Sequence, residues 1–273
     1  MRIVVALARC SHFGPTVAVT TFTTLLAAGA GMSPRRLPWV AAATLAGQLS
    51  VGWSNDWLDR HRDRAARRMS KPLVRGDIAD ETVIRGAVVA VVACLVLTLA
   101  LGWRATVAHM AAVALAWAYN AGLKSTSVSV APYVGAFALL PVVVTLALEP
   151  ARWSPVWAVL AGAALGGGAH FANVLPDLED DAATGVRGLP HRLGVRGSLA
   201  AAAVLSGAGV ACVVIGVPDL ATPARLVLAA TAVAVAAIPV SWLLGRQAAA
   251  FRLAIGAAGG VVVSLLASGS SLV

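Results

Sequence analysis

The chain has 273 residues, of which 59% are hydrophobic and only 12% are charged, about half the charged fraction of a soluble globular domain. The formal net charge is +9, but the charges lie between apolar runs and not on one face of a polar fold, which argues against nucleic acid as a partner. We therefore expect an all-α integral membrane bundle, folded as a single domain over residues 1–273.

Nine apolar runs are each long enough to cross a bilayer as a helix, because a spanning helix needs about 20 apolar residues. The first, within Met1 to Gly31, is interrupted by Ser11, His12 and Pro15 and lacks a clear small-residue cleavage site. We expect it to be a first span and not a cleaved signal peptide. The predicted spans are residues 14–31, 37–54, 83–102, 105–120, 131–148, 155–175, 198–217, 222–244 and 251–270.

Basic residues are unequally shared between the two sides of such a bundle. With nine spans, 16 of the 21 Lys and Arg residues lie in the N-terminus and in the loops after the second, fourth, sixth and eighth spans. Loops rich in Lys and Arg stay on the cytoplasmic side. We therefore expect a multi-pass protein of the cell membrane, with the loops 55–82 and 176–197 facing the cytoplasm.

These two loops carry the same polar pattern, an Asn followed by Asp residues four and eight positions later. The first copy is Asn55, Asp59 and Asp63, and the second is Asn173, Asp177 and Asp181. Each copy follows an apolar span, and Asn173 lies 118 residues after Asn55, which indicates a duplicated helical unit. A merely charged connector would explain one such loop, but it does not explain two copies in register.

The carboxylates of the two copies are expected to share helix faces. Positions 56, 59 and 63 lie on one face of a helix, as do 177 and 181. Five converging carboxylates repel one another unless a cation joins them, and hard oxygen ligands favour Mg²⁺. An Asp at the bilayer centre costs about 3 kcal/mol, so we place the group at the membrane rim. The candidate metal ligands and catalytic residues are Asp56, Asp59, Asp63, Asp177 and Asp181.

Cations follow both copies, and carboxylates with cations suit a diphosphate bridged by metal. They are Arg67, Arg68 and Lys71 after the first copy and Arg187 and Arg192 after the second. Any single arginine is equally well explained as a topology signal. Lys124 is the only charge between Arg104 and Glu149 and is a further candidate, as is Tyr119; their alternatives are an interface anchor and an aromatic-belt residue.

The motifs resemble those of the UbiA superfamily of intramembrane prenyltransferases, with N-D-x-x-D-x-x-x-D in the first and D-x-x-x-D in the second. The first is matched by Asn55, Asp56, Asp59 and Asp63, and the second by Asp177 and Asp181, with Asn173 before it. Lys71-Pro72-Leu73 is similar to the family's basic stretch after the first motif, with a gap about one residue shorter. Tyr119 and Lys124 are similar to its Tyr-to-Lys segment.

The resemblance implies nine transmembrane helices around a central cavity and Mg²⁺ between the Asp motifs and a prenyl diphosphate donor. It also implies transfer of the prenyl group to a lipophilic acceptor, for which an aromatic or quinone-precursor compound is expected, with membrane lipid around the bundle. The substrate-binding residues implied in this way are Asn55, Arg67, Tyr119, Lys124 and Asn173.

Two other functions fit parts of the pattern. A UbiA-type terpene cyclase would ionise the same donor and let the donor's own double bonds capture the cation; the low aromatic content of 5% weakly favours an external acceptor. A cation transporter would also use carboxylates, but normally near the midplane. His170 either contacts the acceptor or is a packed histidine. Donor length, acceptor identity and oligomeric state stay open.

Overall fold

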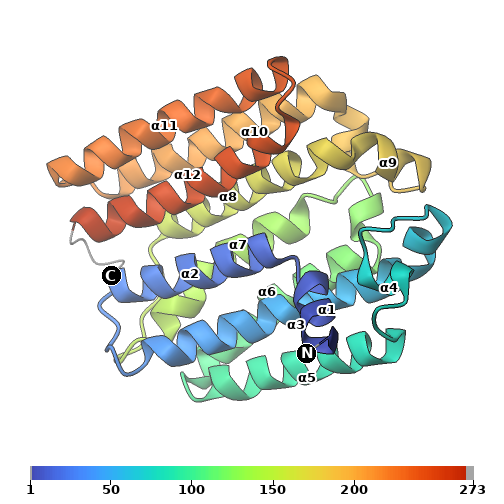
Figure 1. The fold of residues 1–273 in the computed structure, drawn as a ribbon. Helices are drawn as coiled ribbons and strands as arrows, with labels where there is room; N and C mark the ends of the chain where they lie inside the picture. The colour runs from blue at the N-terminus through green and yellow to red at the C-terminus, as the bar shows by residue number, and fades with distance from the viewer. Residues whose placement is uncertain (1, 269–273) are drawn as a thin grey trace.

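The computed structural model describes residues 2–268, and throughout this range the chain forms helices joined by short loops, without β-strands (Figure 1). The all-α prediction is confirmed. The helices are α1 (Arg2–Cys10), α2 (Phe13–Gly29), α3 (Leu37–Ala65), α4 (Pro72–Arg75), α5 (Asp80–Leu99), α6 (Trp103–Ala121), η1 (Leu123–Ser125), α7 (Ala131–Leu146), α8 (Val156–Val174), η2 (Leu175–Asp177), α9 (Leu178–Ala183), α10 (Leu189–Gly216), α11 (Thr222–Leu243) and α12 (Gln247–Ser268).

The predicted spans fall in order on α2, α3, α5, α6, α7, α8, α10, α11 and α12, and residues 269 and 270 of the last span lie outside the described residues. Within residues 2–268, five helices are long and apolar enough to cross a membrane alone, or six if the bent pair α1 and α2 forms one span. α7 is short, with 16 residues, and α3 and α6 bury polar side chains such as Ser54 and Asn120. A count of nine crossings therefore stays a prediction.

Two helices extend well beyond the predicted spans. α3 continues from residue 54, where its apolar run ends, to Ala65 and carries the whole first motif. α10 begins at Leu189, ahead of the predicted start at residue 198, and Gly194 interrupts it with φ of 66°. Hydropathy reports how far a helix is apolar, whereas the backbone hydrogen bonds continue as long as the residues allow helical geometry.

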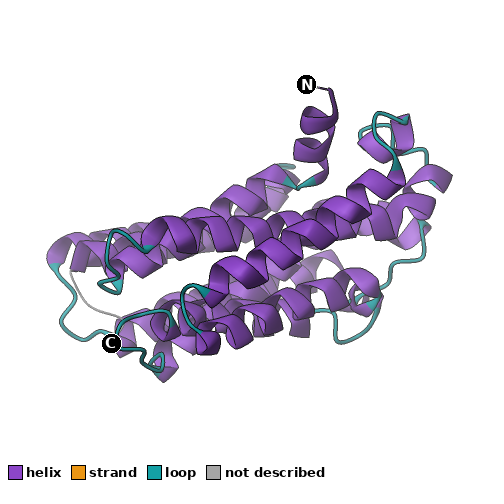
Figure 2. Cartoon of the chain, turned by 90° about the horizontal axis from the view of Figure 1, so that it is seen from below, coloured by secondary structure: helices purple, strands orange, loops and turns teal. Residues whose placement is uncertain are grey.

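The long helices run side by side, and those that carry the two motifs pack in the same manner. α3 packs along α5, and α8 packs along α10. In Figure 1, α8, α10, α11 and α12 form the upper part of the bundle and α3, α5 and α6 the lower part, with α2 and α7 between them. The short helices α4 and α9, which follow the motifs, lie at the same end. Figure 2 shows α1 turning away from the bundle at the N-terminus.

The outer surface of the bundle is apolar and its interior is built mainly from small residues. Leu226, Val233 and Ile215 are largely exposed on α10 and α11, which is favourable in lipid and not in water. Inside, α7 and α8 approach closely at Gly162, where a Cβ would lie 2.5 Å from the carbonyl oxygen of Phe137. Small residues at such contacts are typical of helices packed in a membrane.

Candidate active site

The two motifs meet at one cavity of about 510 Å³, which extends from the Asp-lined end into the middle of the bundle. Deeper in, its wall is mainly apolar and comes from α2, α6, α7 and α12. The polar lining contains members of both motifs and the cations around them: Asn55, Asp59, Asp63, Asn173, Asp177, Asp180, Asp181, Arg62, Arg68, Lys71 and Lys124.

The first motif lies on the last turns of α3, where three carboxylates share the inward face of the helix. Asp56, Asp59 and Asp63 are all buried. Lys124 donates hydrogen bonds from Nζ to both carboxylate oxygens of Asp59, at 2.5 and 2.7 Å, and Arg62 donates to Asp59 Oδ2 at 2.8 Å. Since a buried carboxylate needs such partners, these cations hold Asp59 in the cavity wall.

Asp56 is the most deeply placed of these carboxylates and lies behind the cavity lining. Its Oδ1 accepts a hydrogen bond from Lys71 Nζ at 2.6 Å and lies 3.2 Å from His12 Nε2. Its Oδ2 is buried and has no hydrogen-bond partner among the described residues. An unpartnered carboxylate oxygen at this depth is unusual, because desolvation without a partner is costly. This oxygen is buried, and Asp56 itself does not line the cavity.

The second motif lies where α8 gives way to η2 and α9, and Arg68 joins it to the first. Arg68 lies 3.2 Å from Asp63 and 3.4 Å from Asp181. Partial burial lowers the pKa of Arg68, but Asp63 and Asp181 outweigh it, so that the pKa is raised and the guanidinium stays charged. Arg67, by contrast, has an exposed side chain and a φ of 50°. The structure thus brings Arg68, like Arg62, to the carboxylates, and it does not bring Arg67.

Lys124 reaches the cavity from η1, directly after α6. Burial lowers the pKa of its ammonium group, and Asp59 opposes this shift. Lys124 Nζ also lies 3.4 Å from Asn55 Oδ1. Lys124 is thus in contact with two members of the first motif, Asp59 and Asn55.

An aromatic wall adjoins the motifs, and of its members only Tyr119 was a candidate site residue from the sequence. It consists of Tyr119, Tyr133 and Phe137, all of which line the cavity. Tyr119 and Tyr133 meet edge to face at 5.1 Å, and Tyr133 stacks with Phe137 at 6.2 Å. Asn173 of the second motif donates to Tyr133 Oη at 3.4 Å. The i, i+4 spacing of Tyr133 and Phe137 was the available signal, but such a pair in an apolar run is usually core packing.

His170 lies behind this wall and is fully buried. Its Nε2 lies 3.1 Å from Ser129 Oγ, and its ring packs on Tyr119 and Tyr133. Of the two alternatives that the sequence left open, contact with the acceptor or packing in the interior, the structure therefore favours packing.

The donor set fits Mg²⁺ only if the metal is shared with a ligand. In the part of the chain that is described, no three His, Cys, Asp or Glu side chains lie close enough to hold a metal ion by themselves. Mg²⁺ is commonly bound by one or two carboxylates together with substrate phosphates and water. Carboxylates of both motifs on one cavity, Asp59 and Asp63 from the first and Asp177 and Asp181 from the second, match that mode.

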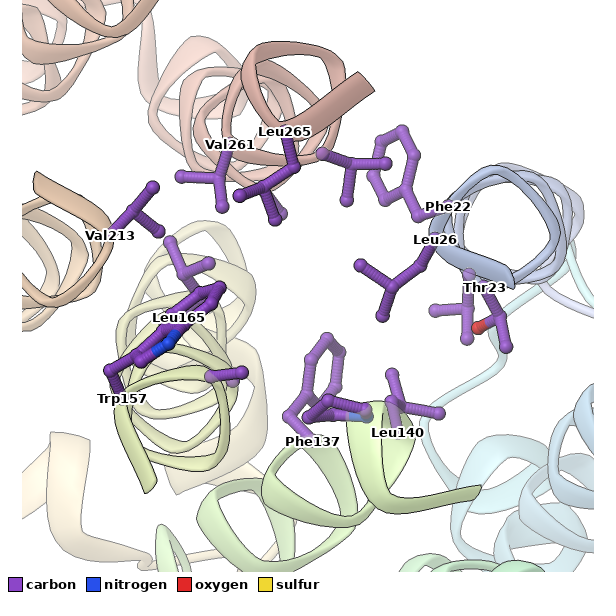
Figure 3. Close-up of a pocket in the computed structure, with 17 residues that line it drawn as sticks. Phe22, Thr23, Leu26, Phe137, Leu140, Trp157, Leu165, Val213, Val261 and Leu265 are labelled. Atoms are coloured by element: carbon purple, nitrogen blue, oxygen red, sulfur yellow. The ribbon is translucent and has the colours of Figure 1, made fainter. Parts of the chain in front are cut away.

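A second, smaller cavity of about 80 Å³ adjoins the first and is lined by apolar side chains (Figure 3). It lies between α2, α7, α8 and α12. The side chains of Phe22, Phe137 and Leu140 face it and also line the larger cavity. Apolar space therefore continues beyond the central cavity toward the far end of the bundle.

Comparisons with known proteins agree with this architecture. A sequence profile of the UbiA prenyltransferase family matches residues 16–267. The apo structure of a UbiA homolog from Aeropyrum pernix K1 superimposes with a TM-score of 0.76 and 20% identity, covering 91% of this chain and 96% of that one. A UbiA homolog from Archaeoglobus fulgidus bound to GPP and Mg²⁺ gives 0.74 and 17%, covering 97% and 98%.

A digeranylgeranylglyceryl phosphate synthase structure is also similar, with a TM-score of 0.71 and 14% identity over 98% of this chain and 99% of that one. Among curated proteins no match was found. Because the family profile covers most of its length, the chain belongs to the UbiA prenyltransferase family. It is a multi-pass membrane prenyltransferase. Its carboxylates lie at the ends of α3 and α8, which removes the main support for an ion path through the midplane.

Proposed function

We propose that the enzyme ionises a prenyl diphosphate at the Asp-lined end of the central cavity, with Mg²⁺, and transfers the prenyl group to a lipophilic acceptor. One observation carries the proposal: carboxylates of both motifs and four cations surround the mouth of a cavity whose deeper wall is apolar. The structure of the Archaeoglobus fulgidus homolog with GPP and Mg²⁺ supports this assignment.

In this proposal the metal is held by Asp59, Asp63, Asp177 and Asp181 at the cavity, with Asp56 behind them. Bound Mg²⁺ supplies neutralisation of charge on the diphosphate as it leaves. Asn55 and Asn173 lie beside these carboxylates and are assigned to diphosphate and metal binding.

The cations at the mouth neutralise the remaining charge of the leaving diphosphate. Lys124 and Arg68 are already in contact with Asp59, Asp63 and Asp181, so they are held where the diphosphate would bind. Arg67 stays a prediction from the family resemblance, and the contacts favour Arg68 for the same task.

The chain then protects and orients the allylic cation. Tyr119, Tyr133 and Phe137 place aromatic rings on the cavity, and such rings attract a cation. The surrounding apolar side chains exclude water that would otherwise capture it. The prenyl tail extends into the apolar part of the cavity. An aromatic or quinone-precursor acceptor is proposed to enter from the lipid phase, and the Asp-lined end is proposed to face the cytoplasm.

The aromatic wall also gives specific support to a second function, a terpene cyclase of the same family. Three aromatic side chains gather on one side of the cavity, although the chain as a whole is poor in them. Such a wall would stabilise a cation that migrates along the donor. The argument from aromatic scarcity against cyclisation is therefore weakened.

The test is diphosphate release by purified protein in detergent from geranyl, farnesyl and geranylgeranyl diphosphates, with and without Mg²⁺. A membrane extract serves as the acceptor source, and lipid products are extracted and identified. An Asp59→Asn/Asp181→Asn double variant is the matched comparison, because each change removes charge and keeps nearly the same shape.

Mg²⁺-dependent release that is lost in the double variant supports the ionising site. A prenylated acceptor supports transfer, whereas a hydrocarbon formed without extract supports the cyclase. Absence of release from every donor, with extract present, contradicts both.

A further inference from the structure

The turn between α1 and α2 brings a histidine to the first Asp motif from a part of the chain outside both motifs. His12 lines the central cavity. Its Nε2 lies 3.2 Å from Asp56 Oδ1 and 3.2 Å from Asn55 Nδ2. Asn55 and Asp56 are the first two residues of the motif. One nitrogen cannot donate to Asp56 and accept from Asn55 at the same time, so we assign Nε2–H as the donor to Asp56 Oδ1.

The backbone at His12 is held in an uncommon conformation. Its φ and ψ are 52° and 59°, in the left-handed region, which non-glycine residues seldom adopt and which costs about 1–3 kcal/mol unless the surroundings enforce it. α1 and α2 meet there at a bend of 72°. This conformation directs the histidine inward at the point where α1 leaves the bundle.

Several contacts besides those of His12 hold the turn in position. Trp53 on α3 donates from Nε1 to the carbonyl oxygen of Leu7 at 2.8 Å, and Thr16 donates from Oγ1 to the carbonyl oxygen of Ser11 at 2.6 Å. The backbone of Ser11 rests directly on Gly52, where a Cβ would lie 2.6 Å from the Ser11 carbonyl oxygen. The turn therefore docks on α3 one helical turn before the motif.

The partners of His12 explain what this docking achieves. Asp56 Oδ1 is shared between Lys71 and His12, both of which line the cavity, whereas Oδ2 is buried. A side chain that holds one oxygen of a carboxylate in this way fixes which oxygen points toward the cavity. His12 thus sets the orientation of the Asp56 carboxylate.

We propose that His12 is a positioning residue of the active site, delivered by the docked α1–α2 turn, which orients the Asp56 carboxylate beside the site of Mg²⁺ and the donor's diphosphate. The inference rests on the proposed function. His12 acts through the motif and takes no part in a bond-making step. The glycine at position 52 is part of the same device, because it is the surface on which the turn docks.

The experiment measures ligand binding apart from turnover. Purified protein in detergent is titrated with inorganic diphosphate at fixed Mg²⁺, and thermal protection is followed. For His12→Ala we expect a 10- to 100-fold rise in the half-protecting concentration, the usual effect of losing an outer-shell partner of a metal ligand. The unliganded melting temperature is recorded beside it. His61→Ala is the control, because it removes an exposed histidine of α3, the helix that carries Asp56.

Two conservative variants separate contact from backbone strain. Gln places its amide nitrogen near the position of Nε2, so His12→Gln is expected to restore most of the binding. Asn tolerates the left-handed conformation better, but its amide is too short to reach Asp56, so His12→Asn is expected to resemble His12→Ala. The opposite ranking would show that only the backbone at residue 12 matters and would overturn the proposal.

Gly52→Ala tests the docking surface without changing a polar group. The added methyl group must displace the Ser11 backbone, so the variant is expected to weaken protection as His12→Ala does. The His12→Ala/Gly52→Ala double variant should have a half-protecting concentration no higher than that of the weaker-binding single variant, because both changes remove the same contact. Gly256→Ala is the control, since a Cβ there meets no atom within 4 Å.

The outcomes separate this inference from the proposed function. If the wild-type protein is not protected by Mg²⁺ with diphosphate, both are overturned. If the wild type is protected and His12→Ala has the same half-protecting concentration, the proposed function stands and the positioning role is wrong. If His12→Ala lowers the melting temperature without ligand but leaves the ligand affinity unchanged, His12 serves only stability and the positioning role is likewise wrong.

Discussion

At the scale of single residues, the active-site end of the cavity is organised by cations that each serve more than one acidic or polar group. Lys124 contacts Asp59 and Asn55, and Arg68 contacts Asp63 and Asp181. Arg68 therefore links the first motif to the second. Such charge-assisted contacts are among the stronger hydrogen bonds in proteins.

We predict that Arg68→Ala is more damaging than Arg67→Ala. Loss of a cation hydrogen-bonded to charged groups is worth about 1.5–3 kcal/mol, and we expect kcat/KM for the donor to fall roughly 10- to 100-fold. Steady-state diphosphate release with both single variants checks this. If Arg67→Ala proves to be the more damaging variant, the family resemblance identifies the diphosphate-binding cation better than the contacts do.

The choice between these arginines shows where prediction from sequence ends. The carboxylates could be named because a spacing of Asn and Asp repeats in register, and helical geometry then places them on one face. The position of Arg68 depends instead on the backbone of Arg67, which follows α3 and is left-handed. The side chain of Arg67 therefore points outward, and that of Arg68 reaches the carboxylates. Tyr133 and His12 were missed for similar reasons, since one lies in an apolar run and the other at a bend between helices.

At the scale of helices, the aromatic wall depends on how closely α7 can approach α8. A Cβ at Gly166 would lie 2.5 Å from the Cβ of Phe137 and 2.7 Å from the carbonyl oxygen of Tyr133. Backbone atoms cannot yield as a flexible side chain can. The glycine is therefore required by the contact that sets the position of the wall.

We predict that Gly166→Ala destabilises the protein by about 1–3 kcal/mol, the usual effect of overpacking, and lowers turnover because α7 must shift. Gly256→Ala on α12 is the matched control, because its methyl group enters open space. Loss of the monodisperse peak during heating in detergent gives the stability, and diphosphate release gives the activity. Equal stability of the two variants would contradict the close approach.

The positions of the helices could be predicted because apolar runs of about 20 residues usually form membrane-spanning helices. Their ends could not, and α3 is the clearest example. Its last turns carry Asp56, Asp59 and Asp63, so hydropathy falls before the helix stops. Those side chains contact cations on neighbouring loops, Lys124 and Lys71 among them, and hydropathy does not register such contacts.

At the scale of the whole molecule, the loops that follow the two motifs lie at one end of the bundle. α4 and α9 are together at that end in Figure 1, and Arg36 and Glu149 form an ion pair between loops at the other. The excess of basic residues predicts that the active-site end faces the cytoplasm.

This orientation can be tested by labelling. In a background with Cys10, Cys94 and Cys212 replaced, His61→Cys reports on the active-site end and Ala151→Cys on the opposite end; both positions are exposed. We expect an impermeant thiol reagent to label position 151 in intact cells and position 61 only after permeabilisation. The reverse pattern would contradict the predicted orientation.

The near balance of charge at the cavity mouth has a consequence for the order in which ions arrive. Five carboxylates and four cations line it, so a free diphosphate meets carboxylates that repel it and a free divalent cation meets Lys and Arg that repel it. A diphosphate already paired with metal presents both signs at once. The site is thus suited to recruit an ion pair, with each component raising the affinity for the other.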